Sequence, residues 1–293
     1  MSAAKINNYT CNICGAKSKV LGFKREIIAA ACPLCGFIWK DKNSIPRDYK
    51  EPWESGLWNT DGVRNDYKVY DYRLKALQEN RRGPLKKIMD FGCGPGRFVT
   101  FLREKGYDSY GCDPGEEFPA VPYFYKSDIS AVDAHDFDAI ISIEAFEHVE
   151  DIKTVMTEIV KRLRKGGLLY VQTNYTHVDS VLGWGYFDFE GHVSFYNPKA
   201  MRILMDHAGL ELIHFDNRKQ TKNVLWFARK FIHLAHKIIP PSLQKASLSK
   251  TAAHLVTETA KFFFGKKLDV QPPKDYVSSV LEVSNCVFIG IKR

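Results

Sequence analysis

The sequence contains no long uninterrupted run of apolar residues. Its 293 residues are 45% hydrophobic and 26% charged, which is ordinary for a globular protein. No segment is apolar over the length that a membrane-spanning helix needs, and the first residues, MSAAKINNYTC, lack the apolar core of a signal peptide. Internal repeats and low-complexity segments are also missing. These absences predict a cytoplasmic protein whose cysteines are thiols or metal ligands rather than disulfides.

Charge is distributed unevenly along the chain. Residues 1–50 contain 9 basic and 3 acidic side chains (+6), residues 51–216 contain 19 and 27 (−8), and residues 217–293 contain 14 and 4 (+10). A polyanionic partner would therefore meet the two ends of the chain. The alternative is that the basic ends serve only solubility.

Four of the seven cysteines form two closely spaced pairs. Cys11-x2-Cys14 and Cys32-x2-Cys35 fit the spacing of a zinc site, and a glycine follows each pair, where a tight turn needs positive φ. Four thiolates leave no open coordination position, so we expect structural Zn²⁺. Residues 1–50 are therefore predicted to be a zinc-ribbon-like module with a hairpin between the pairs. The remaining cysteines are expected to be small buried residues: Cys93, Cys112 and Cys286.

Strand and helix signals alternate from about Tyr67 to Asp216. Strands are predicted at Lys87–Phe91, Tyr107–Cys112, Val121–Tyr125, Phe137–Ile143, Leu168–Thr173 and Leu210–Phe215. Helices are predicted at Tyr67–Asn80, from Arg97, at Asp151–Arg164 and at Pro198–His207. This alternation favours a mostly parallel sheet that is covered on both faces. Residues 51–216 are assigned to this core, residues 217–280 to a helical insertion, and residues 281–293 to the last strand, at Val283–Ile291.

A glycine-rich segment, Asp90-Phe-Gly92-Cys-Gly94-Pro-Gly96, follows the first strand of this core. Glycines there let the backbone approach a ligand closely, and the start of the next helix favours polar or anionic groups. Two acids, Asp113 and Asp128, follow the next strands, at the edge where open α/β sheets bind ligands. A carboxylate at this edge can accept both hydroxyls of a ribose. The spacing differs from the dinucleotide pattern G-x-G-x-x-G.

At this point the sequence resembles the class I S-adenosylmethionine-dependent methyltransferases. Five segments match in order: DFGCGPGRF, YGCDPG, KSDIS, FDAIISIEAFEHVED and LRKGGLLYVQTN. The resemblance covers about Tyr67 to Phe215 and the last strand. It implies a doubly wound, Rossmann-like α/β fold with a seven-stranded sheet and an antiparallel last strand. The zinc ribbon would precede this sheet, and the insertion would lie between its last two strands.

The resemblance also implies which residues bind S-adenosylmethionine. Gly92, Gly94 and Gly96 would pass under the methionine moiety, with Asp90 near its amino group. Further contacts are implied at Asp113 (ribose hydroxyls), Asp128 (adenine amino group), Ile129 (adenine ring), Glu144 (border of the cofactor), and Tyr67 and Arg73 (carboxylate). A nicotinamide or nucleotide-sugar enzyme is the alternative, but the later segments do not suit it.

Methyl transfer from a sulfonium needs a positioned acceptor and, for an alcohol, a base. Candidate catalytic residues follow the fourth strand (Glu147 and His148) and the fifth (His192 and Tyr196). The segment around His192 resembles the small-molecule and glycan branch of these methyltransferases, which favours His192 as the base. A Glu-x-x-Glu-His cluster like Glu144 to His148 can hold a divalent ion in the ubiquinone-type O-methyltransferases. Structural roles for both histidines stay open.

The acceptor itself is not evident from the sequence. A small molecule, a sugar or a lipid-linked glycan, methylated at oxygen, is the leading prediction; RNA bound by the basic ribbon, or a non-catalytic interaction module, is the alternative. Aromatic residues among glycines, Trp184 to Phe189, suggest either an acceptor lid or a small apolar core. The insertion suits a lid, a homodimer interface or a helix at an anionic membrane surface, which would place the protein at the inner membrane face.

Overall fold

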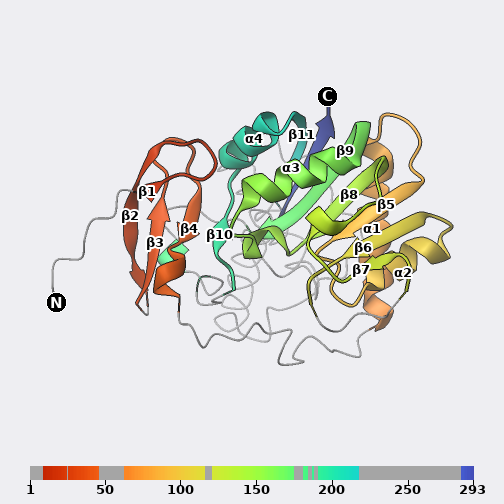
Figure 1. The fold of residues 1–293 in the computed structure, drawn as a ribbon, viewed down its shortest axis with the longest axis horizontal. Coiled ribbons are helices and arrows are strands. Elements are labelled where there is room, and N and C mark those ends of the chain that lie inside the picture. The colour runs from red at the N-terminus through yellow and green to blue at the C-terminus, as the bar shows by residue number, and fades with distance from the viewer. Residues whose placement is uncertain are drawn as a thin grey trace, which may run out of the picture. The chain divides into compact units, whose positions relative to one another are not determined.

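The computed structural model describes residues 9–24, 26–45, 63–115, 121–174, 181–183, 187, 191–217 and 285–293. These residues form two sheets (Figure 1). Except for Asn217, the predicted insertion at 217–280 lies outside this part of the chain, as do Trp184, Tyr186 and Phe189. No helix within the described residues is both long and apolar enough to span a membrane.

The smaller sheet contains the ribbon. Its strands are β1 (Tyr9–Thr10), β2 (Lys17–Lys24), β3 (Ile27–Ala31) and β4 (Ile38–Lys40), followed by the short helix η1 (Lys42–Ser44). β2 and β3 pair antiparallel, so the predicted hairpin between the cysteine pairs is confirmed. A fifth strand, β10 (Ser194–Phe195), comes from much later in the chain and pairs antiparallel with β4.

The larger sheet has seven strands in the order β11-β12-β9-β8-β5-β6-β7. Its parallel strands are β5 (Lys87–Phe91), β6 (Asp108–Cys112), β7 (Phe124–Tyr125), β8 (Phe137–Ile143) and β9 (Leu163–Asn174). β12 (Asn285–Lys292) inserts between β9 and β11 (Leu210–Asn217) and runs antiparallel to β9. The predicted doubly wound α/β fold with an antiparallel last strand is therefore confirmed.

Helices cover both faces of this sheet, and each face has its own apolar core. α1 (Val63–Asn80) and α2 (Arg97–Glu104) pack on one face through residues such as Leu77 and Phe101. α3 (Ile152–Arg162) and α4 (Pro198–His207) pack on the other through Met156 and Met201, and both lie across the near side in Figure 1. The remaining short helices are η2 (Ile129–Ala131), η3 (Phe146–His148) and η4 (Val181–Gly183). Cys93, Cys112 and Cys286 are buried, as predicted.

One predicted helix end is wrong. We expected a helix over Asp151–Arg164 that ends at the following glycines, but α3 ends at Arg162 and β9 begins at Leu163. The reason is tertiary pairing: Leu163 is buried opposite Phe137 in the parallel ladder of β8 and β9. Strand formation thus overrides the local helix signal, and Gly166, with φ of 71°, lies within β9.

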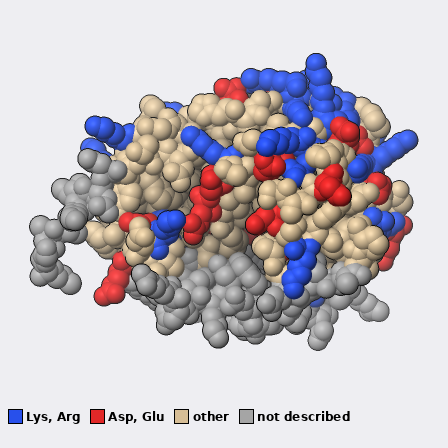
Figure 2. Space-filling model, in the orientation of Figure 1, with Lys and Arg blue, Asp and Glu red and all other residues tan. Residues whose placement is uncertain are grey.

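The basic C-terminal segment is described only from Asn285. Figure 2 shows lysine and arginine side chains gathered at the top of the view, and acidic side chains interspersed elsewhere. Lys292 donates to the carbonyls of Val160 and Leu163 (2.7 and 2.6 Å), and Arg293 pairs with Asp206 (2.7 Å). These two cations therefore make contacts within the fold.

Candidate functional site

The glycine-rich turn connects β5 to α2 at the carboxyl edge of the parallel strands. Gly92, Gly94 and Gly96 have φ of 73°, 48° and 71°, the left-handed region that favours glycine. A Cβ on Gly92 would lie 2.4 Å from that of Ala145, and one on Gly96 would lie 2.0 Å from the ring of Phe124. A Cβ on Gly94 would meet none of the described residues within 4 Å. The turn is thus packed at both ends and open in its middle, where a ligand can lie on the backbone.

Asp113 follows β6 and holds this turn in place. Its Oδ2 accepts a hydrogen bond from the Gly94 amide (2.9 Å), and its Oδ1 accepts one from the Gly115 amide (2.8 Å). The Gly92 amide donates to the carbonyl of Cys112 (2.9 Å). A carboxylate has further lone pairs beyond these two bonds. Asp113 can therefore order the turn and also accept the hydroxyls of a ribose.

Asp90, in β5, carries a buried oxygen that lacks a hydrogen-bond partner, Oδ1. The side chain is only 3% exposed. Burial raises the pKa of this carboxyl to about 8, against the positive charge of Arg73, while the negative charge of Asp113 adds to the rise. An orphaned buried acceptor beside an open glycine turn suits a ligand that brings an amino group. S-adenosylmethionine has such a group, so these residues fit the cofactor that the sequence predicts.

Arg73 extends from α1 toward the same edge of the sheet. It is 8% exposed, and its Nε donates to Oε1 of Gln172 in β9 (3.4 Å). Its positive charge lowers the pKa values of Asp90 and Glu144, which opposes the rise that burial causes. A buried guanidinium in this place can pair with a ligand carboxylate, which is the role that the sequence predicts for it.

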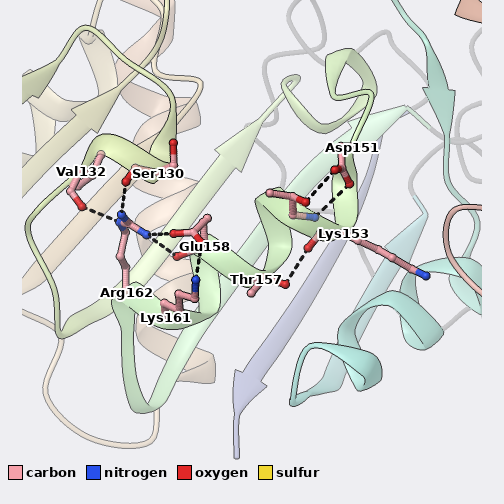
Figure 3. Close-up of polar contacts among 9 residues, drawn as sticks. Ser130, Val132, Asp151, Lys153, Thr157, Glu158, Lys161 and Arg162 are labelled. Atoms are coloured by element: carbon pink, nitrogen blue, oxygen red, sulfur yellow. Dashed lines mark hydrogen bonds and ion pairs between the residues drawn. The ribbon is translucent and has the colours of Figure 1, made fainter.

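The predicted adenine side of the site follows β7. Asp128 is exposed and precedes η2, and Ile129 is buried at the start of this short helix. The buried guanidinium of Arg162, from α3, fixes η2 by donating to the carbonyls of Ser130 (3.0 Å) and Val132 (2.8 Å) (Figure 3). Arg162 also pairs with Glu158 of its own helix, at 2.7 Å. Charge pairing on α3 thus supports the segment that carries Ile129.

Polar side chains connect the ends of β8 and β9. Glu147 is fully buried, and its carboxylate accepts hydrogen bonds from Thr173 Oγ1 and Asn174 Nδ2, both at 2.6 Å. Glu144 accepts from Gln172 and Asn174, both at 3.3 Å. Burial raises the pKa of Glu144 well above its ordinary value, and the negative charge of Glu147 adds to this effect. Glu144 also has a φ of 53°, a strained conformation that is typical of functional sites.

Two histidines join Glu147 from different parts of the chain. His148 ends η3, and His192 lies two residues before β10. The centroids of the two imidazole rings are 4.9 Å apart, in an edge-to-face arrangement. The possible ligand atoms of Glu147, His148 and His192 all lie within 4.8 Å of one another. Burial lowers the pKa of His148 below its ordinary value, against the negative charge of Glu147. The structure thus brings together three of the four predicted catalytic residues, in a cluster that can take up a proton or ligate a cation.

Tyr196 and Tyr67 lie in different surroundings. Tyr196 is fully buried, and its hydroxyl donates to the carbonyl of Phe146 (3.2 Å). Burial raises the pKa of this phenol. Tyr67 is 38% exposed and donates to Glu104 near the end of α2 (2.8 Å). Tyr196 is thus packed near Glu147, whose negative charge adds to the rise in its pKa, and its catalytic role stays a prediction. The bond of Tyr67 lies at the surface, and its contact with the cofactor carboxylate also stays a prediction.

Three residues of the site were not predicted from the sequence. Gln172, Thr173 and Asn174 end β9 and bind the two glutamates described above. Their signal was available, because polar residues that end a buried parallel strand lie at the ligand-binding edge. Oδ1 of Asn174 is buried without a hydrogen-bond partner, so this side chain has an acceptor left for a ligand.

The cysteine pairs form two turns of the same geometry. In the first, the Cys11 amide donates to the carbonyl of Ala16 (2.9 Å), and Gly15 has φ of 76°. In the second, the Cys32 amide donates to the carbonyl of Phe37 (2.9 Å), and Gly36 has φ of 73°. Glycine at these positions gives the turn its left-handed residue without strain.

The four sulfurs are close enough to share one ion. The Sγ atoms of Cys11 and Cys35 are 3.6 Å apart, those of Cys14 and Cys32 are 3.4 Å apart, and all four lie within 4.8 Å. Tetrahedral zinc with Zn–S distances of about 2.3 Å has sulfurs roughly 3.8 Å apart. The contact between Cys11 and Cys35 lowers the pKa of Cys11 and raises that of Cys35, so within this pair the thiolate is favoured at Cys11. The predicted cysteine cluster is therefore present, with a geometry compatible with zinc.

Comparison with known proteins supports the family that the sequence resembles. The sequence profile of the family described as "Methyltransferase domain" matches residues 64–215, which is 152 of 293 residues. The ubiquinone biosynthesis O-methyltransferase of Idiomarina loihiensis is 26% identical over 183 residues, covering 54% of this chain and 75% of that protein. The Vibrio cholerae enzyme of the same name is 24% identical, covering 64% and 86%.

Among solved structures, a SAM-dependent methyltransferase from Archaeoglobus fulgidus is 14% identical with a TM-score of 0.46, covering 77% of this chain and 94% of that one. Because the family profile spans more than half of the chain and the sheet has the predicted topology, this protein belongs to the methyltransferase domain family, as a class I S-adenosylmethionine-dependent methyltransferase.

Proposed function

We propose that this protein transfers a methyl group from S-adenosylmethionine to a hydroxyl of a small-molecule acceptor. The observation that carries the proposal is the cluster of Glu147, His148 and His192, which begins two residues beyond Ala145, the neighbour of the glycine turn. An alcohol must lose its proton when it attacks the methyl group, and a histidine beside a carboxylate suits that task. The O-methyltransferases named among the relatives support the same reaction type.

The cluster has two tasks in this proposal, taking up the acceptor's proton and stabilising the charge that forms. The cofactor brings an activated methyl group, so the chain needs to hold the acceptor in line and to take up its proton. His192 is our candidate for the base, and His148 is the second candidate. Glu147, held by Thr173 and Asn174, stabilises the positive charge that forms on the imidazole.

The same three side chains also suit a divalent cation. A carboxylate and two imidazoles are ordinary ligands of transition metals, and their ligand atoms lie within 4.8 Å of one another. A bound cation would make an acceptor hydroxyl easier to deprotonate. Treatment with a chelator followed by readdition of Mg²⁺ or Mn²⁺ distinguishes the two arrangements. These ions prefer carboxylate to thiolate ligands, so they restore turnover only if a cation acts at the cluster and not through zinc at the four cysteines.

The acceptor is tested directly with labelled cofactor. Purified protein is incubated with methyl-labelled S-adenosylmethionine and separate pools of phenolic small molecules, nucleotide sugars, lipid-linked glycans and RNA. We expect label in a small-molecule or sugar pool, as an alkali-stable methyl ether. Label in RNA alone would instead support the nucleic-acid alternative, and a protein that binds the cofactor without labelling any pool would favour a non-catalytic module.

The role of Asp113 gives a prediction for cofactor binding. We expect Asp113→Ala to weaken S-adenosylmethionine binding roughly tenfold or more, because a charge-assisted hydrogen bond typically contributes about 1.5–3 kcal/mol. The change also removes the acceptor of the Gly94 amide. Isothermal titration calorimetry measures the effect, with Asp206→Ala as a control at an exposed aspartate on α4. Equal affinity in both variants would remove Asp113 from the ribose role.

The cysteine cluster gives a prediction for metal content. We expect about one zinc ion per chain, bound by Cys11, Cys14, Cys32 and Cys35. Elemental analysis of protein purified without chelator measures it. Cys11→Ser should lower the zinc content, whereas Cys112→Ser, at a buried cysteine outside the cluster, should leave it unchanged. Protein that contains no zinc would contradict the assignment.

A further inference from the structure

The ribbon sheet includes a strand from the acceptor side of the site. β10 pairs antiparallel with β4, with Ser194 opposite Trp39 and Phe195 opposite Ile38, and Figure 1 shows the two strands side by side. The chain reaches β10 only two residues after His192. The residue that we favour as the base is therefore followed at once by a strand that the ribbon holds.

Backbone hydrogen bonds connect the ribbon to Glu147 of the site. The amide of Lys40, in β4, donates to the carbonyl of Val193 (2.8 Å). The amide of Val193, which belongs to the peptide bond after His192, donates to the carbonyl of Glu147 (2.8 Å). One residue thus connects the ribbon strand, the His192 segment and η3 by main-chain contacts, which a surface substitution cannot easily disturb.

Asn197 connects the second cysteine turn, which contains the predicted zinc ligands Cys32 and Cys35, to helix α4 of the core. Its Nδ2 donates to the carbonyl of Cys35 (3.1 Å), while its Oδ1 accepts from the Ala200 amide (2.9 Å) and caps α4. A Cβ on Gly36 would lie 2.6 Å from this Nδ2. Glycine at position 36 therefore serves the turn and also lets the Asn197 amide approach a predicted zinc ligand.

Side chains reinforce the connection to η3. The hydroxyls of Ser194 and Tyr196 both donate to the carbonyl of Phe146 at 3.2 Å. The ring centroids of Tyr196 and Phe37 are 5.3 Å apart, and Phe37 directly follows the second cysteine turn. Phe37, Tyr196 and Met201 of α4 belong to one buried apolar cluster. The ribbon thus shares its core with the catalytic domain.

We propose that the four-cysteine ribbon is a positioning element of the acceptor site. Its metal orders β4 and the turn at Cys35, and these hold the segment that carries His192 and, through Val193, the residue Glu147. Asn197 is the positioning residue that links the turn to α4. The proposal rests on the proposed function, because it matters for turnover only if the cluster acts on the acceptor. A misplacement of about 1 Å in a catalytic group can cost roughly 10²-fold in rate.

Hydrogen exchange tests the coupling without any assay of activity. Backbone exchange of the full chain is measured with zinc bound, after removal of zinc by a chelator, and after its return. It is also measured in Cys11→Ser, which loses the ribbon zinc while Glu147, His148 and His192 stay in place. We expect removal to increase exchange in residues 9–45 and also in residues 144–149 and 191–197, with residues 87–96 unchanged, and zinc to restore protection. Increased exchange confined to residues 9–45 would overturn the proposal, whether or not the protein methylates a hydroxyl.

A second variant separates the bridge from the helix cap. Asn197→Ser keeps a good N-cap oxygen for α4 but is too short to reach the carbonyl of Cys35. We expect kcat to fall about tenfold, while the Kd for S-adenosylmethionine, the zinc content and the melting temperature stay near those of the wild type. Asn197→Ala, which also loses the cap, should in addition lower the melting temperature. An unchanged kcat in Asn197→Ser would contradict the positioning role.

Discussion

Replacing His192 by alanine should lower kcat by about 10²–10⁴-fold, the usual contribution of a positioned general base. The imidazole is buried beside His148, with Glu147 in the same cluster, so water cannot easily take its place as a proton acceptor. The affinity for S-adenosylmethionine should change little, because the glycine turn, Asp90 and Asp113 lie on other elements. Single-turnover kinetics with the identified acceptor, together with calorimetry for the cofactor, separate the two effects.

Two comparisons make this result specific. His135→Ala removes an exposed histidine from the loop before β8 and should leave kcat near that of the wild type. His148→Ala tests the second candidate. If His192→Ala retains the full rate while His148→Ala loses it, the base is His148. If both variants retain the full rate, the acceptor reaches the site already ionised and the cluster has another role.

The glycine turn after β5 could be predicted from the sequence because its constraints are local. A turn that needs three residues with positive φ within five positions requires glycine, and the spacing of Gly92, Gly94 and Gly96 shows it directly. Acids that follow buried strands share one edge of a parallel sheet for topological reasons. Asp113 and Asp128 could therefore be placed at this edge without knowledge of the contacts that they make, whereas the role of Asp90 is implied by the family resemblance and stays a prediction.

The acceptor side depends on contacts between distant segments, and its geometry could not be predicted. β10 has only two residues, too few for any periodic signal, and it joins the ribbon sheet across more than 150 positions of sequence. The end of α3 was missed for a related reason, since pairing of Leu163 with Phe137 decides it. The sequence shows which residues can react, but the pairing of β4 with β10 decides where His192 lies.

Cofactor affinity should rise about 100-fold between pH 5 and pH 7, because Asp90 ionises only as the pH approaches its pKa of about 8. Burial raises the pKa of this carboxyl to about 8, so the cofactor-free protein holds it largely neutral at neutral pH. If the ammonium group of S-adenosylmethionine binds the ionised form of Asp90, each pH unit below 8 lowers the affinity about tenfold, which corresponds to about 1.36 kcal/mol of binding free energy. Calorimetry in a series of buffers measures this dependence.

Asp90→Asn is the matched control, because an amide of nearly the same shape stays neutral at every pH. We expect its affinity to be lower than that of the wild type at pH 7 and nearly constant from pH 5 to pH 7. Asp113→Asn should bind S-adenosylmethionine weakly, but its affinity should still rise with pH as it does in the wild type. A wild-type affinity that does not change with pH would show that the cofactor amine is bound by another group.

Stability of the cofactor-free protein gives an independent check on the sign. A carboxyl whose folded pKa lies above its unfolded value of about 3.9 binds a proton in the folded state that the unfolded state releases. Its contribution to stability therefore falls as pH rises from about 4 to about 8 and then levels off. Asn at position 90 has no such loss. The melting temperature of Asp90→Asn should consequently gain on that of the wild type as pH rises through this window, because only the wild type has a carboxyl that ionises in the unfolded chain while the folded chain keeps it protonated.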